Sequence, residues 1–283
     1  MADPGETALE RAGDAARRAG RDWNRTGDQA LFYWDAVIAI PRALRQYKKE
    51  TLRLIAEISM GTGALAMIGG TVVIVGFLTL FTGGTIAVQG YSSLANIGVE
   101  ALTGFFSAFI NVRIAVPVIS GIALAATIGA GATAQLGAMR VSEEIDALEV
   151  MAVASVPYLV STRLVAGMIA IVPLYSLAAL ASFLASRFAT VVLYGQSGGV
   201  YDHYFDTFLI PSDILWSFVQ AITMAIAVML IHTYYGYTAS GGPVGVGVAV
   251  GNAVRASLVV VVVITLLTSL AIYGADGNFN LAG

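Results

Sequence analysis

The sequence predicts an all-α integral membrane protein. Five spans follow an N-terminal amphipathic helix, and a short surface helix lies between spans 2 and 3. Hydrophobic residues make up 57% of the chain and charged residues 12%, against about 45–50% and 25% in soluble domains. The few charges separate long uncharged stretches, a pattern typical of helices that cross a bilayer and are joined by loops.

The N-terminal region divides into two predicted segments. Residues 1–37 form a polar tail without the apolar core of a signal peptide, so the first span is expected to act as the insertion signal. Residues 38–58 carry apolar side chains at helical spacing beside a basic cluster, which predicts a basic amphipathic helix. Two interpretations remain open: a helix in the membrane interface, or a juxtamembrane segment that only sets topology.

Charged residues bound the five predicted spans. The first is placed at 61–81, whose 21 residues extend about 31 Å as a helix, one hydrocarbon thickness. Segment 82–112 is either a short helix in the outer leaflet or an outward extension of span 2. The glycine-rich stretch Tyr234–Asn252 is predicted to be a flexible inner loop. The other four spans are placed at 113–140, 163–187, 214–233 and 256–275.

Basic residues set the predicted orientation. With the N-terminus inside, the 42–53 cluster, Arg140, Arg163 and Arg255 are cytoplasmic, and only Arg113 and Arg187 lie outside. The C-terminal tail, 276–283, is then outside. Asp202 and Asp206 fall in a predicted outer loop, which either contacts a partner protein or is simply solvated.

A short acidic helix is predicted at about 141–152. Ser142 is expected to cap it, and its first turn is acidic, as the helix dipole favours. It is too short and too charged to cross the membrane. It is therefore either a solvated loop helix or a docking surface for a cytoplasmic ATPase. Its carboxylates are Glu143, Glu144, Asp146 and Glu149, and its predicted apolar face is Ile145, Leu148 and Met151.

This region resembles the hallmark of the MlaE/YrbE family, the permease subunits of lipid-transporting ABC systems that work with MCE proteins. The likeness covers about residues 40–275 and is nearly continuous over 134–151. Further matching segments are Tyr158–Val160, Arg163, Gln89–Tyr91, Arg113, Pro117, Tyr235–Tyr237 and Gly241–Gly251. The last two are similar to the loop of actinobacterial YrbE proteins.

The chain departs from the family pattern at several positions. Gln135 stands where the family has Glu, and Ile114 stands where Arg113 would have an adjacent Glu. Residues 152–155 replace Gly-Ile-Asp-Pro, and Thr162 replaces a proline. Such departures suggest one half of an asymmetric pair, in which a partner permease retains the missing residues.

The resemblance implies a permease domain over 59–275 in a bacterial plasma membrane. It implies a dimer with a second permease, a heterodimer being favoured, that opens outward into a lipid pocket beneath an MCE hexamer. It also implies that the loop between spans 2 and 3 binds the ATPase. The expected coupling residues are Arg140, Glu143, Glu144, Asp146, Leu148, Glu149 and Met151.

A substrate path for lipid is predicted at the outer leaflet. It requires mostly apolar walls with polar groups near the headgroup. Gln89 and Tyr91 either line this cavity or pack between helices, and Arg113 either attracts an anionic headgroup or anchors span 2. Arg187 is expected to extend toward headgroups. The apolar candidates are Phe77, Leu78, Leu80, Phe81, Phe105, Phe106 and Phe109.

Several functions are excluded or disfavoured by the sequence. The chain has no cysteine and no Walker A motif, so thiolate chemistry is excluded and ATP with its Mg²⁺ is expected on a partner ATPase. A metal site is not expected because the only histidines, His203 and His232, fall on different segments, and no basic patch suits nucleic acid. An ion-coupled secondary transporter is the alternative, but the predicted span interiors lack the ionisable relays it needs. No convergent cluster suits a membrane-embedded enzyme.

Overall fold

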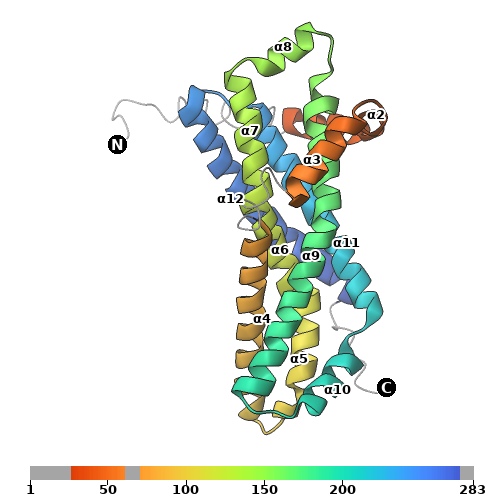
Figure 1. The fold of residues 1–283 in the computed structure, drawn as a ribbon, viewed down its shortest axis with the longest axis vertical. Coiled ribbons are helices and arrows are strands. Elements are labelled where there is room, and N and C mark those ends of the chain that lie inside the picture. The colour runs from red at the N-terminus through yellow and green to blue at the C-terminus, as the bar shows by residue number, and fades with distance from the viewer. Residues whose placement is uncertain (1–26, 61–70, 275–283) are drawn as a thin grey trace, which may run out of the picture.

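The computed structural model describes residues 27–60 and 71–274, which form helices joined by short turns, with no strand among them. Five helical segments are long and apolar enough to cross a membrane, which confirms the predicted fold class. The spans run up and down along the long axis of the molecule (Figure 1). Their bounds are Thr71–Ala95, Glu100–Val141, Val156–Leu193, Pro211–Tyr237 and Gly242–Ile272.

Spans 1, 4 and 5 are single α-helices, and spans 2 and 3 are composite. Span 1 is α4 (Thr71–Ala95), span 4 is α11 (Pro211–Tyr237) and span 5 belongs to α12 (Gly242–Tyr273). Span 2 consists of η1 (Glu100–Leu102), α5 (Thr103–Ile110), η2 (Asn111–Ala115), α6 (Val116–Leu124), η3 (Ala125–Gly129) and α7 (Ala130–Val141). Span 3 consists of η4 (Val156–Ser161), α9 (Thr162–Phe188) and η5 (Ala189–Leu193). The segments η2, η3, η4 and η5 are π-helical.

The predicted end of span 1 was wrong. The described helix runs from Thr71 to Ala95, whereas the prediction was 61–81, of which 61–70 lies outside the described residues. No charge between Glu57 and Glu100 marks a boundary, and the helix tolerates its hydroxyl side chains because they bond to its own carbonyls. Gly98, at a φ of 73°, then turns the chain directly into span 2. Segment 82–112 is therefore the end of α4 and an outward extension of span 2.

The glycine-rich stretch before span 5 is helical, so its prediction as a flexible loop was wrong. Only residues 238–241 separate α11 from α12, and Gly241 takes a φ of 89° there. Pro243 sits in the first turn of α12, where its missing N–H costs no hydrogen bond. Glycine is common in membrane helices because a lipid surround leaves the backbone no other partner than itself.

The N-terminal region is more structured than predicted. Residues 27–38 are helical rather than part of a polar tail. The predicted single helix over 38–58 is divided into α2 (Ile40–Gln46) and α3 (Lys48–Met60), with a break at Tyr47. Thr51 and Leu54 bury one face of α3, which packs along α9.

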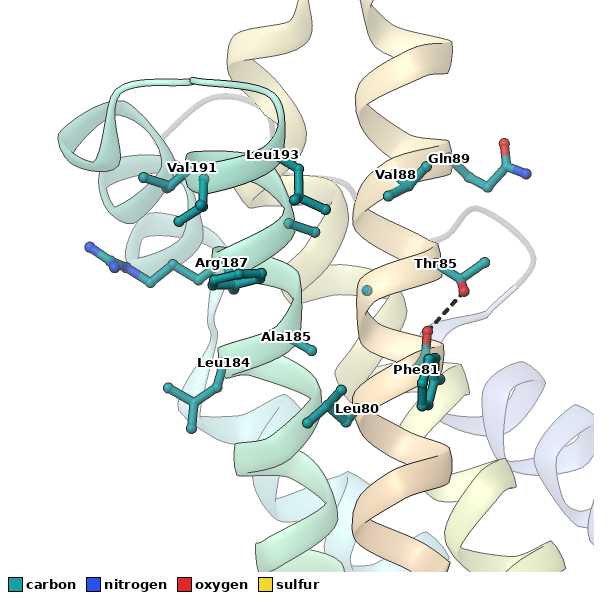
Figure 2. A pocket seen from close by; sticks show the side chains of 14 residues that line it. Leu80, Phe81, Thr85, Val88, Gln89, Leu184, Ala185, Arg187, Val191 and Leu193 are labelled. Carbon is teal, nitrogen blue, oxygen red and sulfur yellow. Dashed lines mark hydrogen bonds between the residues drawn. The ribbon is translucent and has the colours of Figure 1, made fainter.

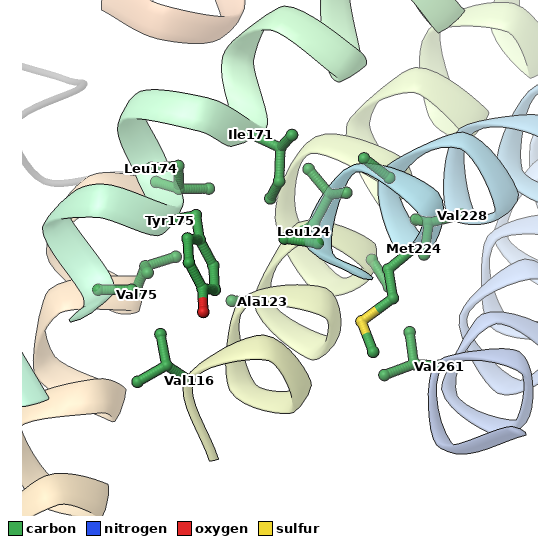
Figure 3. Packing of buried hydrophobic residues seen from close by; sticks show 14 residues of the cluster. Val75, Val116, Ala123, Leu124, Ile171, Leu174, Tyr175, Met224, Val228 and Val261 are labelled. Carbon is green, nitrogen blue, oxygen red and sulfur yellow. The ribbon is translucent and has the colours of Figure 1, made fainter. Parts of the chain in front are cut away.

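The core lies where spans 2, 3 and 4 meet. Leu124, Tyr175 and Met224 are fully or almost fully buried, and Val261 of span 5 closes the cluster (Figure 3). Half or nearly half of each central span is buried, against 22% of span 1 and 17% of span 5. Spans 1 and 5 therefore flank the bundle and present most of their apolar surface outward.

Candidate functional site

The short helix between spans 2 and 3 lies at one extreme end of the molecule, and α10 (Gly198–Phe208) lies at the other (Figure 1). The short helix is α8 (Glu144–Val150). Left-handed residues precede and follow it, Glu143 at a φ of 60° and Ala152 at a φ of 58°. Ser142 does not cap it, contrary to the prediction, because the Ser142 hydroxyl bonds back to the Ala138 carbonyl at 3.0 Å and so ends α7.

The apolar face of α8 is narrower than predicted. Ile145 is fully buried among Ala36, Leu136, Leu159 and Val160, and so joins α8 to three other parts of the fold. Leu148 packs at the edge of this cluster. Met151 is 64% exposed and Val150 is 88% exposed, so they do not face the core. The turn that follows Val150 redirects Met151 to solvent.

The four carboxylates of α8 and its preceding turn have different environments. Glu143 and Glu144 are exposed, and together with Val150 and Met151 they form the solvent-facing surface of this segment. Asp146 is exposed too, but it pairs with Arg140 of α7 at 2.6 Å. Glu149 is exposed as well, and its Oε1 atom accepts hydrogen bonds from Ser155 at 2.7 Å and from Tyr237 at 3.2 Å. All four carboxylates are therefore exposed, as predicted, and two of them also bond to neighbouring segments.

Arg163 is buried at the start of α9, close to α3. Its guanidinium donates to the Leu159 carbonyl at 2.9 Å and to the Gln135 side chain at 3.4 Å, and Gln135 in turn donates to Glu57 of α3 at 3.4 Å. Glu57 of α3 thus supplies a carboxylate beside position 135, where the family pattern has Glu. Hydrogen bonds from Arg53 hold the pKa of Glu50, on the same helix, below its usual value.

A groove of about 850 Å³ runs along η5 and along the halves of α4 and α9 that lie toward α10 (Figure 2). Its walls are almost entirely apolar, and the hydroxyl of Thr85 is turned back onto the Phe81 carbonyl at 2.8 Å. Beyond Gln89, Tyr91 stacks on Tyr194 with ring centroids 4.2 Å apart. The lining residues are Leu80, Phe81, Gly84, Thr85, Val88, Gln89, Leu184, Ala185, Arg187, Phe188, Ala189, Val191, Val192 and Leu193.

The predicted substrate-path residues do not share one surface. Phe81, Leu80 and Gln89 line the groove, whereas Phe77 lies further along the exposed face of α4 and Tyr91 lies in the aromatic stack. The groove wall from α9 and η5 was missed, because the sequence does not show which faces of two apolar helices meet. Leu78 is exposed on α4 and Phe106 is half-buried against Gly90.

Phe105, Phe109 and Arg113 belong to a second contact, away from the groove. Phe105 packs on Phe208 of α10 at 4.6 Å, and the Arg113 guanidinium lies 4.3 Å from the centre of the Phe109 ring. Arg113 is 6% exposed and donates to Asp213 at 2.7 and 2.9 Å. Of the two predicted roles of Arg113, this geometry supports anchoring span 2 to span 4, and it is not in the groove. Asp213 supplies the carboxylate that Ile114 does not.

A polar network inside the membrane region joins spans 1, 2 and 3. Asn111 donates to Ser186 at 3.0 Å and accepts from Ser182 at 2.8 Å, while Ser186 donates to the Gly83 carbonyl at 2.8 Å. A Cβ on Gly83 would lie 2.3 Å from the Ser182 carbonyl oxygen, so α4 and α9 touch backbone to backbone. The small-polar spacing of Ser182 and Ser186, at i and i+4, was the signal available in the sequence.

The predicted outer loop around Asp202 is the helix α10. Arg187, at the outer end of α9, donates to both Asp202 oxygens at 2.8 Å, so its side chain holds α10 rather than extending freely. These hydrogen bonds keep the pKa of Asp202 below its usual value. Gly104 of α5 allows the backbone of α10 to approach, since a Cβ there would lie 2.3 Å from the Tyr201 carbonyl oxygen. Tyr201 is buried, and burial raises its pKa to about 12.

Five spans, an apolar groove and a helix projecting from one end define a multi-pass membrane protein of the transport permease class. A family model described as permease MlaE matches residues 60–271. The chain belongs to the MlaE permease family.

Three relatives give the scale of the similarity. A probable ABC transporter permease of Rickettsia bellii is 28% identical over 155 residues, covering 54% of this chain and 60% of that protein. The chloroplast protein trigalactosyldiacylglycerol 1 of Arabidopsis thaliana is 28% identical over 57% of this chain and 46% of its own length. A probable ABC transporter permease of Synechocystis is 24% identical, covering 60% and 64%. The chain thus spans about half to two thirds of the curated relatives it matches.

Proposed function

We propose that this chain is the permease subunit of an MCE-type ABC transporter that moves lipids or other hydrophobic molecules across a bacterial cell envelope. A separate cytoplasmic ATPase binds and hydrolyses ATP, and the chain itself is not catalytic. The chain lies in the plasma membrane with its N-terminus inside and its C-terminus outside. Family membership supports the transporter class, and the structure of α8 supports the coupling to an ATPase.

The observation that carries the ATPase proposal is the solvent-facing surface of α8. The helix projects beyond the spans (Figure 1) and is fixed from beneath by Ile145, yet Val150 and Met151 remain exposed beside Glu143 and Glu144. Exposed apolar side chains rimmed by charges are typical of protein contact surfaces. We refer to α8 as the coupling helix from here on.

The groove between α4 and α9 supports a hydrophobic substrate. Its apolar lining suits an acyl chain, and from Leu80 to Gln89 its α4 wall extends about 14 Å along the helix axis. The Arabidopsis relative is named for a galactolipid, which favours lipid as the substrate class. Arg187, at the groove, is already paired with Asp202, so the side chains present select the apolar part of a lipid more than an anionic headgroup.

A second permease and an MCE hexamer complete the proposed assembly. Spans 1 and 5 expose most of their surface, which suits a partner of the same kind within the membrane. The departures at Gln135 and Ile114 continue to favour a heterodimer, although Glu57 and Asp213 of this chain take over part of the missing charge. At the outer end, α10 is the surface on which an MCE protein would sit.

Charge reversal tests the coupling helix. Glu143→Lys with Glu144→Lys changes two exposed carboxylates without touching Asp146 or Glu149, and we expect the tagged permease to lose its ATPase during purification from native membranes. Asp206→Lys, on exposed α10 at the opposite end, is the matched control and should retain the ATPase. Full recovery of the ATPase by the double variant would refute the proposed docking surface. Mass spectrometry of lipids that co-purify with the unaltered permease identifies the substrate class.

A further inference from the structure

Three side chains meet where the coupling helix ends. Ser155 donates to Glu149 at 2.7 Å, Tyr237 donates to the same carboxylate oxygen at 3.2 Å, and the two hydroxyls lie 2.7 Å apart. Glu149 belongs to α8, Ser155 immediately precedes span 3, and Tyr237 is the last residue of α11. This Glu149–Ser155–Tyr237 junction therefore ties the coupling helix to spans 3 and 4.

The junction is well satisfied and laterally supported. One carboxylate oxygen accepts from both hydroxyls, which uses the single proton of each and forms two charge-assisted bonds. The Tyr237 ring packs 5.4 Å from the Phe32 ring, and Ser155 is buried. Ile145 inserts one turn before Glu149, so the coupling helix is attached near both of its ends.

Span 4 differs from its central neighbours in continuity. Spans 2 and 3 each contain two π-helical segments, and span 3 also contains Pro173, all of which are places where helices bend. The 27 residues of α11 form an unbroken α-helix about 40 Å long, with proline only at its first position. Its inner end carries Tyr237 and its outer end carries Asp213, which is paired with Arg113.

We infer that Glu149 is a positioning residue that fixes the coupling helix to the inner end of α11, rather than a residue that docks the ATPase. An ATPase that displaces the coupling helix then moves α11 as a single rod, and the movement reaches the Arg113–Asp213 pair at the outer end. This inference rests on the proposed function, since it requires an ATPase bound to the coupling helix. It separates two exposed glutamates of the same segment, because the Glu149 carboxylate accepts from Ser155 and Tyr237, whereas the Glu144 carboxylate accepts from the neighbouring Ser142.

The test compares Glu149→Gln with Asp35→Asn, which removes the same charge from an exposed carboxylate on the helix over 27–38, outside the proposed docking surface. Each tagged permease is purified with its native ATPase, and amide hydrogen exchange over residues 211–220 is measured before and after ATP, Mg²⁺ and orthovanadate are added. We expect Glu149→Gln to retain the ATPase but to lose most of the nucleotide-induced change in exchange, about threefold or more, because an amide oxygen accepts the two hydroxyls without the charge that strengthens these bonds. Tyr237→Phe should behave in the same way, and Asp35→Asn should retain the change.

Three results would overturn the inference. They are loss of the ATPase from Glu149→Gln, an undiminished response in that variant, or an equal loss of response in Asp35→Asn. Failure of the unaltered permease to bind any ATPase would instead refute the proposed function. The permease alone gives a separate readout, because Glu149→Gln and Ser155→Ala are expected to raise amide exchange in the coupling helix by about fivefold. Unchanged exchange there would show that the junction does not hold the helix.

Discussion

Arg113 and Asp213 form an ion pair that is largely shielded from water, with side chains only 7% and 16% exposed. Removing one member leaves the other charge buried without compensation, which costs more than the intact pair contributes. The Phe109 ring covers the guanidinium and further reduces its access to water. The pair therefore acts as a fixed attachment between spans 2 and 4.

We predict that Asp213→Leu alone destabilises the permease by about 3 kcal/mol, because Arg113 loses its counter-charge in a low-dielectric site. The double variant Arg113→Met with Asp213→Leu should recover most of that loss. Thermal unfolding in detergent, followed by Trp fluorescence, measures both. A double variant no more stable than Asp213→Leu would show that the two side chains do not act as a pair.

Residue-level roles were the least predictable from sequence. Asp213 lies 100 positions after Arg113, so no local pattern connects them. The partner of Glu149, Tyr237, is 88 positions away, and Ser142 was assigned to the wrong helix end because Glu143 takes a left-handed conformation. Ala152 occupies the position where the family pattern has glycine, and its backbone is left-handed. That conformation explains why glycine suits this turn, and the sequence alone does not show it.

Among the elements, α4 and α9 make the closest approach. Gly83→Ala would place a methyl group against the Ser182 backbone, and we predict a loss of about 2 kcal/mol or more as the helices separate and the Ser186 bond to the Gly83 carbonyl weakens. Gly84→Ala is the matched control, since nothing lies within 4 Å of its Cβ position and alanine favours the helix. Thermal unfolding of both variants measures the difference in stability. Equal stability of Gly83→Ala and Gly84→Ala would show that α4 and α9 are not in tight contact at Gly83.

The docking of α10 onto α9 is predicted to depend on pH. Hydrogen bonds from Arg187 hold the pKa of Asp202 below its ordinary value of 3.8. A depressed carboxyl pKa means that the ion pair stabilises the docked helix fully above pH 3.8 and that this contribution is lost as the pH falls through the lowered pKa. Amide exchange in α10, corrected for intrinsic rates, should rise over that interval. Asp202→Asn should abolish the pH dependence, whereas Asp206→Asn should leave it intact.

Elements were predicted well wherever charges bound them. Spans 2 to 4 followed from charged residues that the bilayer excludes, and the acidic helix followed from a charged run too short to cross. The failures share one cause: between Glu57 and Glu100, and again over 238–251, no charge marks an end. Over Thr71–Ala95 and again over 242–251 the backbone is helical, as expected where lipid would offer it no other hydrogen-bond partner.

For the whole molecule, the two ends are predicted to face opposite sides of the membrane, with the coupling helix inside. Because the chain contains no cysteine, single cysteines at exposed Val150 and Thr207 can be labelled individually. In right-side-out vesicles, a membrane-impermeant maleimide should label Thr207→Cys but label Val150→Cys only after permeabilisation. The reverse pattern would overturn the predicted orientation.

The backbone contact at Gly83 also limits how the molecule can change shape. Spans 1 and 3 touch at Gly83 and are joined there by the hydrogen bond from Ser186. Sliding of packed helices needs side chains between them that can rearrange, so we expect these two spans to move as one rigid body. The groove of about 850 Å³ has walls from both of these spans. Its width is therefore set during folding, and the transport cycle must admit and release cargo by moving other helices across its open side.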